Sequence, residues 1–168
     1  MCGRCLIAAL LKPACALLSG SGAVLGGGAA GDSTFILRQV LDRGLDDVAM
    51  GPLWDPIAVR LAFEAGVGAR LSLRLGGKTS PLSGDPVDAV CTIRALHQDM
   101  VMTGLGLDPA LSRIVVLKSS QHFRAAFAAM AAAVICVDAP GSVRADLKSL
   151  TYRKARQDLW PLAACGTG

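Results

Sequence analysis

The C-terminal part of the chain alternates between strand-like and helix-like segments, and this order restricts the fold more than any other feature. Residues 113–117 and 134–137 are short apolar runs typical of buried strands, and residues 122–130 between them have a helical pattern. Two buried strands joined through a helix form a βαβ unit, whose strands lie parallel in one sheet. We therefore predict an α/β fold: a single domain with a mixed β-sheet flanked by helices and a C-terminal βαβ unit.

The middle of the chain predicts further elements of the same kinds. A helix is expected at residues 33–41, with Asp32 or Ser33 as its N-cap, and a second at residues 56–64, which opens with a proline. Strands are expected at residues 47–53, 69–75 and 87–96. The last two alternate apolar and polar residues, which is typical of half-buried strands.

Composition excludes several classes of protein. With 52% hydrophobic and 18% charged residues among 168, the chain can bury a core and is not a disordered tail. Because soluble domains carry roughly 25% charge, part of the surface is expected to be apolar, covered by another domain or subunit and prone to self-association. The net charge of +4 with few aromatic residues argues against nucleic-acid binding.

The N-terminus and the cysteines bear on location and metal binding. The apolar runs at residues 5–11 and 14–18 are separated by Lys12 and Pro13, and neither is long enough for a leader or a membrane span. Six scattered cysteines favour a reducing compartment, so we expect a cytoplasmic protein. The Cys2-Gly-Arg-Cys5 spacing resembles half of a zinc site, but no second pair follows, and no metal site is expected in this chain.

The first candidate site is the glycine-rich loop at residues 19–31. It contains Gly26, Gly27 and Gly28 and leads through Asp32 into a helix N-terminus, where free backbone N–H groups favour anions. The spacing is close to that of a phosphate-binding loop, but Asp32 stands where a lysine is needed and would repel phosphate. A packing turn with an N-cap and a wall of a ligand-binding cleft remain open as alternatives.

The second candidate site follows the strand at residues 113–117. Lys118, Ser119, His122 and Arg124 lie between that strand and the next helix, and this end of an open α/β sheet commonly binds ligands. Two cations, a hydroxyl and a titratable imidazole suit an anionic or carbonyl substrate. A capping serine beside a surface histidine is the alternative, and spacing alone leaves both open. The other histidine, His97, has no clustered acid and is expected to be a solvated surface residue.

Several segments together resemble the C-terminal domain of the microcystinase C (MlrC) type zinc metallopeptidase family. These segments are Gly26–Thr34, Leu73–Thr79, Ile114–Phe127, Val137–Gly141, Tyr152-Arg153 and Trp160–Leu162. The resemblance covers residues 24–162. Residues 1–23 are then a non-family segment, with disorder as an open alternative, and residues 163–168 are a tail.

The resemblance implies a zinc-dependent hydrolase that cuts linearised cyanobacterial peptide toxins. In that family an N-terminal α/β domain, absent here, holds the zinc ligands, so zinc is implied for the full-length family and none is expected on this chain alone. Gly26 to Gly28 and Asp32 would shape one wall of the substrate cleft. Lys118, Ser119, His122 and Arg124 would bind a substrate carboxylate or stabilise the oxyanion, with His122 as the candidate catalytic residue.

Two departures from the family pattern affect this expectation. Residues 23–25 replace an Asp-Asn-Pro opening of the glycine loop, and a few tens of residues are missing between Asp99 and Gly104. We therefore expect a truncated member that supports catalysis together with an N-terminal peptidase domain or a second copy of itself. The alternatives are a non-catalytic remnant acting as a packing or interaction module, and a small anion-binding module.

Overall fold

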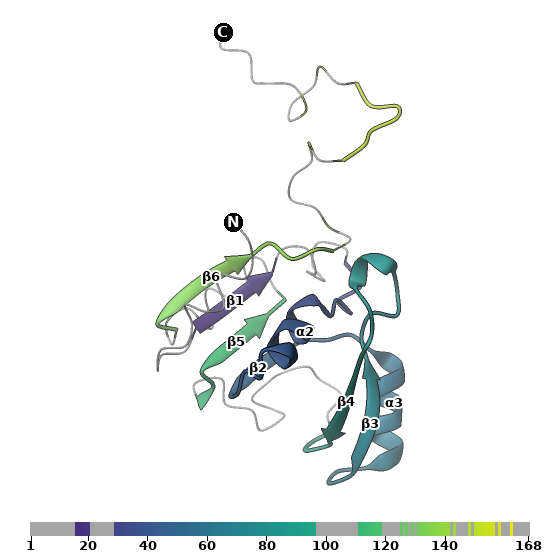
Figure 1. Ribbon diagram of the computed structural model, residues 1–168, viewed down its shortest axis with the longest axis vertical. Helices are drawn as coiled ribbons and strands as arrows, with labels where there is room; N and C mark the ends of the chain where they lie inside the picture. The colour runs from purple at the N-terminus through teal and green to yellow at the C-terminus, as the bar shows by residue number, and fades with distance from the viewer. Residues whose placement is uncertain are drawn as a thin grey trace.

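A computed structural model describes residues 16–20, 29–96, 111–118, 131–141 and 150–156, together with the single residues 125, 127, 129, 143, 148, 158 and 162. The chain forms a four-stranded parallel sheet and a separate two-stranded antiparallel sheet (Figure 1). The α/β class is therefore confirmed, with its parallel and antiparallel strands in two sheets. None of the helices among these residues is long and apolar enough to cross a membrane.

The parallel sheet has the strand order β2-β5-β1-β6. β1 lies between β5 and β6, and β2 pairs with the other edge of β5. Because every pair is parallel, the carboxyl ends of all four strands meet at one edge, where Lys118 directly follows β5. The strands span β1 Ala16–Gly20, β2 Val48–Gly51, β5 Ile114–Leu117 and β6 Ala133–Val137.

The core is built around both faces of β5. Ile114 and Val116 pack on one face with Ile36 of helix α2 (Phe35–Asp42), and Val115 and Leu117 pack on the other with a group that includes Phe127. A strand covered on both faces needs a continuous apolar run, which explains why the sequence signal was clear here. Burying each such side chain contributes about 1.5–3 kcal/mol.

The second sheet is a hairpin covered by one helix. Strands β3 (Arg70–Leu75) and β4 (Val87–Thr92) pair antiparallel, with Leu73 and Val87 buried on the inner face. Helix α3 (Pro56–Ala65) contacts β3, and a short 3₁₀ helix, η2 (Pro81–Ser83), lies in the connection between the strands. The alternating pattern of both strands is confirmed, although the second strand ends at Thr92 rather than at residue 96.

Two expected boundaries differ at the N-terminal side. β1 occupies residues 16–20, so Ser19 and Gly20 belong to a strand and not to the glycine-rich loop expected at residues 19–31. The strand also lies inside the segment 1–23 that was expected to stand outside the family domain. A strand of five residues that begins with apolar Ala16, Leu17 and Leu18 is too short for its sequence pattern to be distinguished from the apolar run before it. The helix expected at residues 122–130 falls mostly outside the described residues.

Candidate functional site

Lys118 holds the segment that enters helix α2. Its Nζ donates hydrogen bonds to the carbonyl oxygens of Gly31 (2.8 Å) and Ser33 (2.9 Å), and its backbone N–H donates to Gly51. The residue is only 6% exposed. Burial lowers the pKa of the Lys118 ammonium to about 8, and the nearby Asp32 carboxylate opposes this effect only in part. The lysine therefore fixes this segment to the carboxyl edge of the parallel sheet.

Asp32 fixes the same segment from the hairpin side. Its Oδ2 accepts hydrogen bonds from the backbone N–H groups of Lys78 and Thr79 (both 2.9 Å), and its Oδ1 accepts one from Ser83 Oγ (2.6 Å). Burial alone would raise the pKa of this carboxyl, but the hydrogen bonds from Ser83, Thr79 and Lys78 outweigh burial and lower it to about 2. Asp32 is thus a buried, ionised acceptor.

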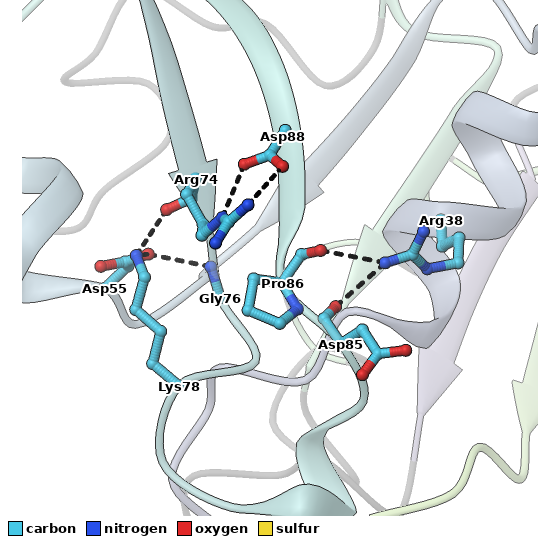
Figure 2. Close-up of polar contacts among 8 residues, drawn as sticks. All are labelled: Arg38, Asp55, Arg74, Gly76, Lys78, Asp85, Pro86 and Asp88. Carbon is cyan, nitrogen blue, oxygen red and sulfur yellow. Dashed lines mark hydrogen bonds and ion pairs between the residues drawn. The ribbon is translucent and has the colours of Figure 1, made fainter.

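A second carboxylate, that of Asp55, holds the turn at residues 76–79, which follows strand β3. Asp55 Oδ2 accepts hydrogen bonds from Gly76 N–H (2.8 Å) and from Lys78 Nζ, and Oδ1 caps helix α3 through Ala58 N–H (3.1 Å). Figure 2 shows the Lys78 ammonium between Asp55 and the backbone carbonyl of Arg74. Burial opposes ionisation, yet the hydrogen bond from Lys78 and the two backbone N–H groups lower the pKa of Asp55.

The turn requires glycine at position 76. Gly76 has φ of 57°, and a Cβ there would lie 2.5 Å from the carbonyl oxygen of Asp32 and 2.7 Å from Thr34 Cγ2. The next residue, Gly77, donates its N–H to that same Asp32 carbonyl (2.8 Å). The backbone of the turn therefore packs directly against residues 32–34, a contact that a larger side chain would prevent.

The start of helix α2 holds the far end of the same connection. Thr34 Oγ1 donates to the carbonyl oxygens of Asp85 (2.7 Å) and Ser83 (3.2 Å), and Arg38 Nη2 donates to those of Asp85 (3.2 Å) and Pro86 (3.0 Å). Both Arg38 bonds are visible in Figure 2. Residues 31–34 are therefore clamped between the parallel sheet and the hairpin connection at residues 76–86. We call this arrangement the clamp.

Two of the candidate residues from the sequence lie in the clamp, and the structure brings them together. Asp32 and Lys118 both hold residues 31–33, each through different partners. Asp32 is nevertheless not the N-cap, and neither is Ser33. Helix α2 begins at Phe35 with Thr34 in the N-cap position, and no side chain caps it. The expectation was wrong because the Asp32 carboxylate bonds a turn that lies far away in sequence. The other candidates lie outside the described residues: Gly26, Gly27, Gly28, Ser119, His122 and Arg124.

Sequence reasoning missed Thr34, Asp55 and Ser83 as members of the clamp. For Asp55 a local signal exists, because an aspartate directly before a proline is typical of an N-cap. The contacts of Asp55 with Gly76 and Lys78, and those of Thr34 with the hairpin connection, join residues more than 20 positions apart. No local pattern predicts such pairs.

The clamp positions backbone and offers little chemistry of its own. Its two carboxylates accept hydrogen bonds from backbone and side-chain donors, and its two ammonium groups donate to carbonyl or carboxylate oxygens. Within the described part of the chain, no three His, Cys, Asp or Glu residues come close enough to hold a metal ion. The residues that the structure describes therefore do not fit a zinc site. The clamp fits a role in holding residues 31–34 at the carboxyl edge of the sheet.

Comparison with known proteins identifies the family. The chain belongs to the family described as MlrC C-terminus, which matches residues 18–104 and 96–154. It is similar to Microcystinase C from Sphingomonas sp., with 32% identity over 173 residues that cover 81% of this chain and 33% of that protein. Its fold is similar to a solved structure from Mesorhizobium sp. BNC1 described as a candidate metallopeptidase, with a TM-score of 0.60 and 24% identity, covering 82% of this chain and 36% of that one.

The alignments also show what the relatives have in addition. The chain spans about a third of the length of each of these two proteins. The alignment with Microcystinase C is longer than the part of this chain that it covers, so the relative carries a few tens of residues that this chain lacks inside the aligned region. The two family matches meet at residues 96–104, which is where the sequence predicts a missing segment.

Proposed function

We propose that this chain is the supporting domain of an MlrC-type metallopeptidase and takes part in peptide or amide hydrolysis only together with a metal-binding domain. The observation that carries the proposal is the clamp, in a chain that belongs to this family. Its acids and lysines hold backbone in place, so it supports a role in shaping a substrate site. The substrate class proposed is a linear peptide, which is what the resemblance to the family implies.

The loops on either side of the clamp would form the substrate wall. Residues 26–28 precede the clamped segment, and residues 119–124 follow Lys118 at the carboxyl edge of the sheet. In this proposal Asp32 and Lys118 act by positioning these loops. Ser119 and Arg124 would bind a substrate carboxylate, and His122 would stabilise the oxyanion. The zinc that the family implies would be held by ligands of the other domain, and it would supply Lewis-acid activation there.

We also propose that the protein works in a reducing compartment. The described cysteines, Cys91 and Cys136, are both free thiols, which supports a cytoplasmic location.

The test is zinc content and peptide hydrolysis of the purified 168-residue chain, alone and mixed with the part of Sphingomonas Microcystinase C outside the aligned third. As a positive control, that part is also mixed with its own aligned third. We expect neither zinc nor hydrolysis from the chain alone, and hydrolysis from the mixture. Zinc and activity in the chain alone would show a self-sufficient enzyme. If the mixture is inactive while the positive control is active, the chain is a non-catalytic packing module and the proposal is wrong.

A further inference from the structure

Helix α3 has the composition of a buried helix but an exposed surface. It packs on the hairpin through small residues, with Ala58 buried and Ala62 one turn later partly buried, while its large apolar side chains point elsewhere. Ile57 and Val59 are each 52% exposed, and Leu61 and Phe63 are 39% and 48% exposed. A helix that is apolar nearly all round is normally covered on most sides.

The arrangement along the helix defines two apolar ridges. With 3.6 residues per turn, Ile57 and Leu61 line one side of the Ala58–Ala62 contact, and Val59 and Phe63 line the other. Only a narrow stripe opposite the hairpin is polar, formed by the Arg60–Glu64 ion pair at 3.8 Å. We call the two ridges the α3 surface.

The outer face of the neighbouring hairpin is different. There Arg74 and Asp88 form a two-bonded ion pair with both distances 2.8 Å, and Arg70, Ser72 and Thr92 are exposed beside it. That face is an ordinary solvent-facing surface with one exposed apolar residue, Val90. In Figure 1, α3 lies at the edge of the molecule, with the hairpin between it and the four-stranded sheet. The exposed apolar area is therefore concentrated on the α3 surface, and an exposed apolar patch marks an interaction site.

We infer that the α3 surface packs against the part of the family's chain that lies outside the region aligned here. The Mesorhizobium structure shares this fold over 82% of the present chain, yet that share is only 36% of its own length, and the corresponding share of Microcystinase C is 33%. About two thirds of each relative therefore lies outside the aligned region, which is enough chain to cover a helix. This inference rests on the proposed function, since it names the surface through which the supporting domain joins its partner.

The experiment measures association by size-exclusion chromatography with light scattering and by titration. The probe is the part of Sphingomonas Microcystinase C outside the aligned third, with its own aligned third as the positive control. The variants are I57K/L61K and V59K/F63K, one for each ridge. The control is V90K, which places a lysine at an exposed valine on the outer face of the hairpin. Because all of these side chains are already half exposed, each variant is expected to fold, and circular dichroism verifies that.

The expected result is binding by the wild-type chain and by V90K, with binding weakened roughly tenfold or more by lysines on at least one ridge. If the wild type and both ridge variants bind equally, the α3 surface is not the interface, although the proposed function stands. If the wild type does not bind while the positive control does, both the proposed function and this inference fail. If the chain alone forms a dimer that the ridge variants dissociate, a second copy occupies the surface and the inference is overturned.

Discussion

Lys118 donates hydrogen bonds to the carbonyl oxygens on either side of Asp32, those of Gly31 and Ser33, while the Asp32 carboxylate bonds the hairpin connection. The two side chains thus hold one short segment from two sheets. They are close enough for the Asp32 charge to influence the Lys118 ammonium, although each bonds other partners. Residues 31–33 are therefore positioned by two charged side chains that are both buried.

Replacing Lys118 by methionine should destabilise the fold. The change removes the donor from the carbonyl oxygen of the buried Ser33, while the Gly31 carbonyl keeps the hydrogen bond from Trp54 N–H. An unsatisfied buried group costs about 1–3 kcal/mol. The free energy of unfolding, measured with urea, should therefore fall by about 1–3 kcal/mol. The control is Lys154→Met at an exposed position, which should change stability by less than about 0.5 kcal/mol. Equal stability of the two variants would mean that Lys118 does not brace the loop.

Stability should decrease in acid through Asp32. The pKa of the Asp32 carboxyl is about 2 in the folded state, against an ordinary value of 3.8 in the unfolded chain. Between these pH values the folded state therefore binds fewer protons than the unfolded state. The stabilisation is fully present above about pH 4 and is lost as pH falls towards 2. Urea unfolding at pH 5 and pH 3 should show this loss, and Asp32→Asn should reduce the slope. An unchanged slope in the variant would assign the acid sensitivity to other groups.

Alanine at Gly76 should be far more damaging than alanine at Gly44. Both glycines have φ of 57°, so the backbone strain of about 1 kcal/mol is shared. A Cβ at Gly44 meets nothing within 4 Å, whereas one at Gly76 lies 2.5 Å from the Asp32 carbonyl. We expect Gly76→Ala to cost at least about 2 kcal/mol more than Gly44→Ala in thermal or urea unfolding. Similar losses in both would show that the turn relaxes away from residue 32.

Removing the Thr34 hydroxyl should loosen the hairpin connection. Thr34→Val keeps the shape of a residue that is 1% exposed but deletes the donor to Asp85 and Ser83. The expected cost is about 1–3 kcal/mol, with faster amide hydrogen exchange in residues 81–86. Thr92→Val, at the exposed end of β4, is the control and should leave both quantities unchanged. Unchanged exchange in Thr34→Val would remove this residue from the clamp.

The sequence predicted those parts of the fold that follow from local patterns. β5 was evident because a strand covered on both faces must be apolar throughout, and β3 and β4 because their alternation reflects one buried face. The division into two sheets was not evident, since strand pairing joins distant segments. In the clamp, Asp32 and Lys118 stood out as charges beside glycines and a strand end. Their partners did not, because Asp32 bonds residues more than 40 positions away.

The place of β1 between β5 and β6 has a consequence for how the chain folds during synthesis. Ala16 pairs with Ile114 on one side and with Ala133 on the other, so β1 gains both neighbours only after residues 114–137 have emerged from the ribosome. The α3–β3–β4 unit, in contrast, is local and can form early. The nascent protein should therefore form its hairpin before its parallel sheet, because closing the sheet is a high-contact-order step that waits for β6.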